Sequence, residues 1–231
     1  MHRATFLARI NRFVALVRLG KEEIPVHLTN PDGLTILRPG LPCLLREAAS
    51  PGRKTAYDLF SVEVDGVPVV VDSLAINHAA ELYLRSPEQL LDPGKTLSVT
   101  PRDSIYDTRV DLNAYHMKGY WFIQVKGITW CEDGVGYYPD TASARTAKNI
   151  YDLLGLSRFD WDPALLFVTG REDIECIRPA DSIDPDFGIA LDHAQLKEAP
   201  ILGVCCGLRG EELVPLRTIP VILPSAKRMP S

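Results

Sequence analysis

Short apolar stretches separated by turn-forming residues fill the first third of the chain. Strands are expected in RFVALVRL, from Arg12, in IPVHLT and in CLLREA, with the turn clusters NPDG and RPG between them. Asp65 and Gly66 lie between two runs rich in β-branched residues, which predicts a tight hairpin because a type I′ turn requires positive φ at both central positions. Short strands at this spacing predict a small barrel or sandwich.

The pattern changes near residue 75, after which helical periods alternate with buried apolar runs. Helices are expected at Asn77–Ser86 and in TASARTAKNIYDLLG, where Asp140 is placed to cap the first turn. A third helix is expected in DPDFGIALDHAQLKEA, with Asp184 as N-cap and Pro185 at its first position. ALLFVTG and ILGVCCGL are typical of buried strands, so this part of the chain predicts an α/β domain.

Charge is distributed unevenly between these two parts. The net charge of −5 by itself argues against a nucleic-acid partner. Residues 1–54, however, contain nine Lys and Arg against four Asp and Glu, and the rest of the chain is acidic. We therefore predict a basic β domain at 1–75 attached to an acidic α/β domain at 76–231. Solvated surface charge without a partner is the alternative.

Two further features bear on location and on metal chemistry. No apolar run reaches the roughly 18 residues that a membrane helix needs, and the N-terminal segment lacks the apolar core of a signal peptide. A cytoplasmic protein without membrane contact is expected. The five cysteines form no CxxC pair, so we interpret them as thiols of the apolar core rather than as metal ligands.

The segment TRVDLNAYHMKGYWFIQVKGI predicts two strands and a turn, and its second strand carries polar residues in an apolar run. Gln124 and Lys126 share one face because side chains alternate along a strand. A two-residue turn at Lys118-Gly119 would place Asp111 opposite Lys126. A four-residue loop, His116–Gly119, would instead place Asp111 opposite Gln124. Both alternatives put the three side chains on one face, whereas an odd loop or a bulge would not.

Asp111, Gln124 and Lys126 together would have a chemical meaning. A carboxylate and an amide oxygen can share a hard divalent cation whose shell is completed by water. A nearby ammonium can orient or help deprotonate a water molecule and stabilise charge on a phosphate. The trio therefore outlines a metal-dependent phosphodiester-cleavage site. A structural hairpin with a solvated polar face is the alternative.

Several longer motifs follow one another in order between about Phe6 and Leu223. They include RKTAYDL, VDSLAIN, TRVD, IQVKGITW, YYPDTASAR and RPADSIDPDF. Together they resemble the sugar fermentation stimulation protein A (SfsA) family. The resemblance implies a mixed α+β and α/β chain, with an N-terminal OB-like β-barrel followed by a PD-(D/E)XK nuclease-like α/β domain. It also implies DNA as a partner and a proposed role in regulating sugar utilisation.

The same resemblance assigns the candidate nuclease residues. Asp111 and Lys126 match the Asp and Lys of the nuclease motif, and Gln124 stands where the family has Glu. Asp140 matches a further aspartate, so Asp111, Gln124 and Asp140 are the expected ligands of Mg²⁺ or Mn²⁺. The missing Glu reduces the charge available to the cation and puts catalysis in doubt.

The sequence differs from the family pattern at two more positions, and several basic residues are expected to contact DNA. Ala144 and Asn149 stand where the family usually has Glu and His. Glu81 matches an acidic residue of the first helix. The basic residues expected to contact DNA are Arg9, Arg12, Arg53, Lys54, Arg145 and Lys148.

The resemblance and the residues together favour a DNA-binding protein of the SfsA type with little sequence preference and a degenerate nuclease-like site. Two other functions remain open from the sequence. One is an active Mg²⁺-dependent DNA endonuclease, which requires that Gln124 serve in place of Glu. The other is a non-enzymatic interaction scaffold with neither DNA nor metal.

Overall fold

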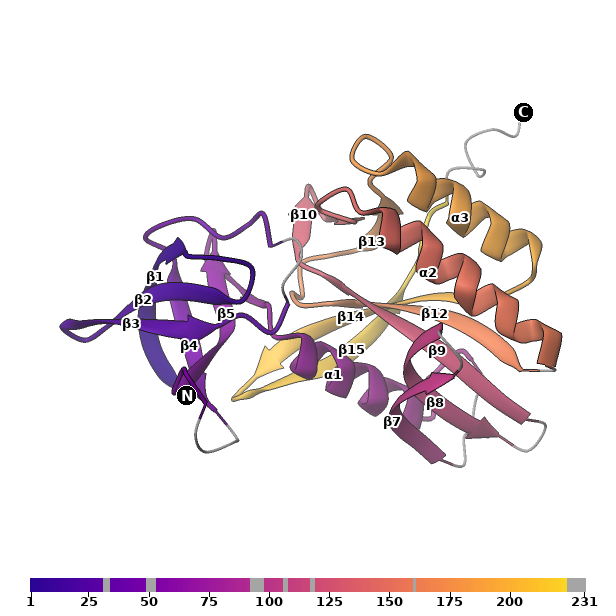
Figure 1. Ribbon diagram of the computed structural model, residues 1–231, viewed down its shortest axis with the longest axis horizontal. Coiled ribbons are helices and arrows are strands. Elements are labelled where there is room, and N and C mark those ends of the chain that lie inside the picture. Colours follow the sequence, from indigo (N-terminus) through magenta and orange to yellow (C-terminus); the bar gives the residue numbers. More distant parts are fainter. Residues whose placement is uncertain are drawn as a thin grey trace.

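Strands at the start of the chain curl into a barrel, drawn in indigo and purple at the left of Figure 1. The computed structural model describes residues 1–30, 34–48, 53–91, 98–105, 108–116, 119–159 and 161–223. The barrel strands are β1 (His2–Arg9), β2 (Val14–Leu19), β3 (Glu22–His27), β4 (Pro42–Glu47), β5 (Tyr57–Val64) and β6 (Val67–Val70). Their order is β3-β2-β1-β4-β5-β6, and a further pairing of β3 with β5 closes the barrel.

The barrel encloses its own apolar core because alternate residues of each strand point inward. Phe6, Val17 and Leu45 are among its buried side chains. The predicted hairpin at Asp65-Gly66 joins β5 to β6, and both residues have positive φ, 52° and 81°. That prediction is confirmed.

The second strand of the barrel begins later than the apolar pattern indicates. The pattern predicts a start at Arg12, but the strand starts at Val14. The Asn11 side chain accepts a hydrogen bond from the Phe13 backbone N–H at 2.8 Å, and the Ile10 N–H donates to the Val14 carbonyl. These local bonds hold residues 10–13 in a turn, which takes the Arg12 backbone out of the strand.

The rest of the chain forms a mixed sheet of order β15-β14-β12-β9-β8-β7 with helices on both faces (Figure 1). Its strands are β7 (Ser98–Ile105), β8 (Thr108–His116), β9 (Gly119–Ile128), β12 (Asp162–Thr169), β14 (Ile201–Arg209) and β15 (Glu212–Ile219). A smaller sheet joins β10 (Trp130–Glu132), β11 (Val135–Tyr138) and β13 (Cys176–Pro179). The parallel neighbours β9, β12 and β14 form the centre of the larger sheet.

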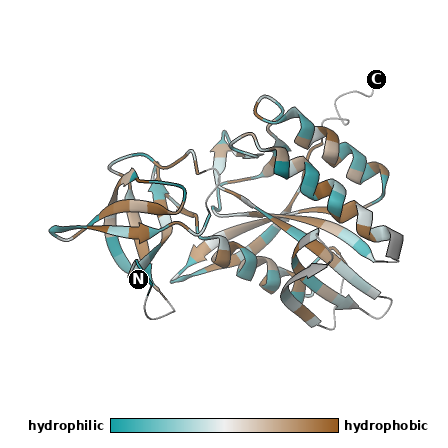
Figure 2. Ribbon diagram, in the orientation of Figure 1, coloured by the Kyte–Doolittle hydropathy of each residue, from teal (hydrophilic) through white to brown (hydrophobic). Residues whose placement is uncertain are grey.

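Helices cover the two faces of this sheet. Helix α1 (Ser73–Arg85) packs on one face. Helices α2 (Ala144–Gly155) and α3 (Pro185–Leu196), with the 3₁₀ turn η1 (Leu156–Phe159), pack on the other. Figure 2 shows hydrophobic residues along the central strands where the helices cover them. None of the helices in the described ranges combines the length and the apolar character of a membrane span.

The N-terminal caps of the helices test where the sequence predicted each helix to begin. Asp184 caps α3 by accepting from the Phe187 N–H at 3.1 Å, with Pro185 in the first turn, as predicted. Helix α1 begins at Ser73 rather than Asn77, because the Asp72 carboxylate accepts from the N–H of the second residue of the helix at 2.9 Å. This cap, which the sequence pattern did not reveal, extends the helix by one turn.

The predicted cap of α2 is wrong. The helix starts at Ala144, after Ser143, whose side chain makes no capping bond. Asp140 lies before this point and its carboxylate is used elsewhere, by Thr35 of the barrel.

Direct polar bonds fasten the barrel to the α/β part. The Val70 N–H, at the end of β6, donates to the Gly170 carbonyl at 2.7 Å. Arg46 lies over the Phe60 ring at 4.2 Å and pairs with the buried Asp72 carboxylate at 3.0 Å. Both parts can therefore contribute to a site at their junction.

Candidate metal site

The hairpin β8–β9 has the register of the second sequence alternative. Its cross-strand partners run from His116 with Gly119 to Leu112 with Ile123. Continuing this register places Asp111 opposite Gln124, and the alternative with Asp111 opposite Lys126 is wrong. The connecting residues 117–118 lie outside the described ranges.

The three polar side chains of the hairpin are buried. Exposed fractions are 7% for Asp111, 2% for Gln124 and 7% for Lys126. A solvated polar face is therefore excluded. Buried charges require compensation from partners or ions, so the surroundings of this carboxylate and this ammonium decide what they can do.

Backbone groups fix Asp111 and Gln124 in place. The Asp111 Oδ2 accepts a hydrogen bond from the Val125 N–H at 3.0 Å, which ties the carboxylate of β8 to the backbone of β9. The Gln124 Nε2 donates to the Asn149 carbonyl of α2 at 2.9 Å. Because the amide nitrogen is used in this way, the group that Gln124 can offer to a cation is its neutral carbonyl oxygen.

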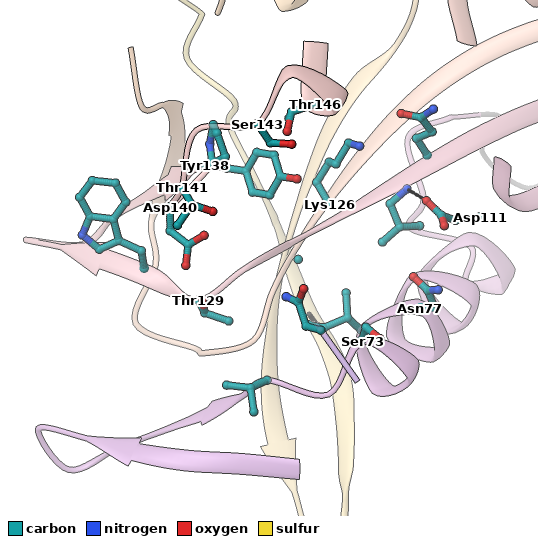
Figure 3. A pocket seen from close by; sticks show the side chains of 18 of the residues that line it. Ser73, Asn77, Asp111, Lys126, Thr129, Tyr138, Asp140, Thr141, Ser143 and Thr146 are labelled. Carbon is teal, nitrogen blue, oxygen red and sulfur yellow. Dashed lines mark hydrogen bonds between the residues drawn. The ribbon is translucent and has the colours of Figure 1, made fainter. Parts of the chain in front are cut away.

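These side chains line a pocket of about 260 Å³ at the junction of the two parts. Figure 3 shows Lys126 with Asp111 to one side and Tyr138, Ser143 and Thr146 to the other. Thr29 and Asn30 of the barrel also line the pocket. The barrel therefore contributes to the wall of the site.

Asp140 lies on the same pocket, on the side that meets the barrel. Its Oδ2 accepts from the Thr35 N–H at 3.1 Å and from the Thr35 hydroxyl at 3.4 Å. The structure thus brings all four predicted site residues to one cavity. Across the described ranges, no three His, Cys, Asp or Glu side chains gather as a metal-binding group. The oxygen donors present fit a hard cation, with fewer charges than a full carboxylate set would give.

An ion pair supports the wall of the pocket. Arg171, 6% exposed, pairs with Asp173 through two bonds of 2.6 Å and donates to the Thr129 carbonyl at 3.5 Å. The bond from the guanidinium lowers the pKa of the Asp173 carboxyl. Thr129 lines the pocket and Arg171 does not. Arg171 therefore stabilises the position of the pocket wall through the Thr129 backbone.

The remaining residues predicted in the α/β part divide between pocket and surface. Arg145 lines the pocket. Lys148 pairs with Asp152 on the exposed side of α2. Glu81 pairs with Arg85 at 2.7 Å along α1 and does not line the pocket.

The basic barrel residues expected to contact DNA differ in the contacts that their side chains make within the barrel. Arg9 donates from Nε to the Asn11 carbonyl at 3.3 Å and from Nη2 to the Arg12 carbonyl at 3.2 Å, which orders the turn between β1 and β2. Arg12 lies over the ring of Phe13 at 5.7 Å, and that ring is 51% exposed.

The other two barrel candidates follow β4. Arg53 makes two bonds to Asp58, at 2.7 and 3.1 Å, and the same carboxylate contacts His27 at 3.0 Å. This pairing raises the pKa of the Arg53 guanidinium and offsets its charge. Lys54 is exposed. The charge of Arg53 is therefore already engaged by a carboxylate within the barrel.

Sequence reasoning missed much of the polar lining. It includes Ser73, Asn77, Tyr138, Ser143 and Thr146. Every one of these except Thr146 lies in VDSLAIN or YYPDTASAR, two of the motifs that carried the family resemblance. These residues were therefore visible in the sequence as parts of family motifs, but no role had been assigned to them.

Comparison with known proteins gives the family. Residues 7–71 match the family described as "SfsA N-terminal OB domain", and residues 75–212 match "Sugar fermentation stimulation protein RE domain". The chain belongs to the SfsA family. This confirms the resemblance found in the motifs and the OB-like nature of the barrel.

Relatives in this family cover nearly the whole chain. A sugar fermentation stimulation protein homolog of Clostridium perfringens (strain 13 / Type A) is 30% identical over 227 residues, 96% of this chain and 97% of its own length. A homolog from Clostridium kluyveri (strain ATCC 8527 / DSM 555 / NBRC 12016 / NCIMB 10680 / K1) is 31% identical over 219 residues, 93% and 94% of the two chains. The solved structure of Pyrococcus furiosus SfsA in complex with Ca²⁺ superposes with a TM-score of 0.87 at 24% identity, covering 96% of both chains. The SfsA fold is thereby established.

Proposed function

We propose that this SfsA-family protein binds DNA with little sequence preference and holds Mg²⁺ or Mn²⁺ in a nuclease-like pocket weakened by Gln124. One observation carries the proposal: Asp111, Gln124 and Lys126 are all buried and line one pocket at the junction with the OB barrel. The Ca²⁺ named with the Pyrococcus furiosus protein supports a divalent cation in this fold.

The residues divide the work of such a site. The buried Asp111 carboxylate supplies the charge that attracts the cation, and Gln124 adds a neutral oxygen. Lys126 supplies an ammonium that can hold a phosphate oxygen and stabilise charge developing there. A bound divalent cation would polarise the phosphodiester and lower the pKa of water.

The departures from a full nuclease set favour binding over cleavage. Gln124 removes a carboxylate from β9, and Ala144 and Asn149 leave α2 without the Glu and His that the family usually has there. DNA held without rapid cutting fits a regulator, and the family name connects that role to the use of sugars. Plasmid nicking in Mg²⁺ and in Mn²⁺ separates this proposal from an active endonuclease, and a gel shift with and without EDTA separates both from a scaffold.

Duplex affinity should depend steeply on salt. If three barrel cations such as Arg9, Arg12 and Lys54 contact phosphates, counterion release gives a slope of about −2.7 in log affinity against log salt. Affinity should then fall roughly 40-fold between ~50 and ~200 mM salt. Fluorescence anisotropy with two unrelated duplexes measures the slope. Equal affinity across that range, or strong preference for one duplex, would contradict electrostatic non-specific binding.

The variant Asp111→Asn should weaken Mn²⁺ binding about tenfold. The substitution keeps the shape of the side chain and its ability to accept from the Val125 N–H, but removes the buried charge. Calorimetric titration with Mn²⁺ checks this. Asp186→Asn, on the exposed first turn of α3, is the matched control. An equal Mn²⁺ affinity in Asp111→Asn and wild type would place the cation elsewhere.

A further inference from the structure

Three neighbouring strands carry a regular grid of side chains at the edge of the larger sheet. Two cross-strand rows run over β7, β8 and β9, one through Ser98, Tyr115 and Tyr120 and the other through Thr100, Asn113 and Phe122. Directly paired residues lie on the same face of a sheet. All six side chains line one hollow of about 470 Å³, with Trp161 at its side.

The rings in this hollow contact one another, and the two tyrosines also reach solvent while Phe122 is buried. Centroids lie 5.0 Å apart for Tyr115 and Tyr120, 6.4 Å for Tyr120 and Phe122, and 5.0 Å for Phe122 and Trp161. Tyr120 is 49% exposed and Tyr115 is 38% exposed. Tyrosine rings so exposed in a sheet row leave a flat aromatic face open to a ligand.

The hollow is on the same side of the sheet as the candidate metal site. Phe122, Gln124 and Lys126 alternate along β9 and therefore share a face. The residues between them, including Ile123, point to the α1 side. Tyr120 and Lys126 are six residues apart, about 20 Å of strand, and the side chains between them on this face, Phe122 and Gln124, are buried.

We infer that this hollow is a stacking site for an unpaired nucleobase of a nucleic-acid strand. The inference rests on the proposed DNA-binding function and adds single-stranded DNA to its substrates. Aromatic rings on an open sheet bind bases through their π-faces. Hydroxyl and amide groups in the two rows, Ser98, Thr100 and Asn113, can hydrogen-bond base edges.

The chemistry favours a base over a protein surface. A protein patch that docks another protein has an apolar centre with a polar rim, whereas here polar side chains alternate with rings inside the hollow. A nucleobase offers both a flat face and polar edges, and so matches this mixture. Stacking is also tolerant of sequence, in keeping with non-specific binding.

The test is the affinity of a ten-nucleotide oligo-dT for wild type, Tyr120→Leu and Tyr120→Phe, measured by anisotropy at several salt concentrations. Tyr120→Leu should bind about 5- to 150-fold more weakly, the range that corresponds to losing one stacked base. Tyr120→Phe keeps the ring and should bind as wild type does. The salt slope should be unchanged in both variants, because the tyrosine neutralises no phosphate.

Tyr151→Leu is the matched control, since Tyr151 is a 41% exposed tyrosine on α2 outside the hollow. It should leave the oligo-dT affinity unchanged, and duplex affinity should be the same in all variants. Wild-type oligo-dT affinity in Tyr120→Leu would overturn the stacking site while leaving duplex binding intact. Wild type that binds neither oligo-dT nor duplex would overturn both this inference and the proposed function. A dimer that becomes monomeric only in Tyr120→Leu by light scattering, with oligo-dT affinity retained, would assign the hollow to self-association instead.

Discussion

Replacing Gln124 by Glu should tighten Mn²⁺ binding about tenfold and start or accelerate DNA cleavage. The substitution adds a negative charge beside Asp111 in a position only 2% exposed. At an effective dielectric of 20, a unit charge about 4 Å away contributes up to about 4 kcal/mol before desolvation costs. Part of that already exceeds the roughly 1.4 kcal/mol that corresponds to tenfold in affinity.

The same substitution should lower stability when the metal is removed. Gln124 Nε2 donates to the Asn149 carbonyl at 2.9 Å. A Glu carboxylate has no hydrogen to donate, so its oxygen and the Asn149 carbonyl oxygen would be two acceptors facing each other. An unsatisfied buried pair of this kind costs about 1–3 kcal/mol. Thermal unfolding of Gln124→Glu should therefore occur below wild type in EDTA and recover with Mn²⁺. This readout does not depend on cleavage.

Plasmid nicking by wild type, Gln124→Glu and Gln124→Glu/Lys126→Ala at equal Mn²⁺ completes the test. The double variant should lose the gain in cleavage, because no ammonium would remain to orient water or hold the phosphate. Gln195→Glu, on the exposed side of α3, controls for net charge and should change neither binding nor cutting. Gln124→Glu that binds Mn²⁺ no better than wild type and cuts no faster would remove Gln124 from the metal site.

The variant Gly170→Ala should destabilise the protein by about 3 kcal/mol, the upper part of the usual range for overpacking. A Cβ at this position would lie 2.2 Å from the Val70 carbonyl oxygen, and backbone cannot move aside as a side chain can. Gly170 is also bonded on both sides, donating to the Ile128 carbonyl at 2.8 Å and accepting from the Val70 N–H at 2.7 Å. The added methyl would thus push the end of β6 away from the sheet.

Urea unfolding of Gly170→Ala and Gly155→Ala gives a matched pair. Gly155 lies at the end of α2, where an added Cβ would meet no atom within 4 Å, so alanine there should be neutral or slightly stabilising. Both variants add one methyl group to a glycine. Equal free energies of unfolding for the two variants would show that the barrel can shift at the contact between Val70 and Gly170 to make room for the methyl group.

Local patterns predicted the elements better than the junction between them. The alternation of Gln124 and Lys126 placed their side chains on one face, and the Asp184-Pro185 pair marked the start of α3. The register of the hairpin stayed open because two loop lengths were compatible with the same pattern. The pairing of β8 with β9 in the structure decides it, for example that of Leu112 with Ile123.

The contacts that complete the pocket are invisible to periodicity. Asp140 had the position of a helix cap, yet its partner is Thr35, 105 residues away in another domain. Glu81 was matched to an acidic residue of the first helix, four residues beyond VDSLAIN, but on α1 it pairs with Arg85 and does not line the pocket. Long-range partners depend on how two domains dock, and no local spacing of residues records that.

The bond between Thr35 and Asp140 joins the two domains at a carboxylate that also lines the pocket. A cation drawn to the Asp140 carboxylate would compete with Thr35 for the same negative charge. Such coupling is reciprocal. If the cation weakens the docking of the barrel by a given free energy, a ligand that stabilises the docked barrel weakens cation binding through the same coupling free energy. Under the proposed function, DNA that stabilised the docked barrel would raise the Mg²⁺ concentration at which the pocket fills, and Mg²⁺ would weaken the binding of that DNA by the same factor.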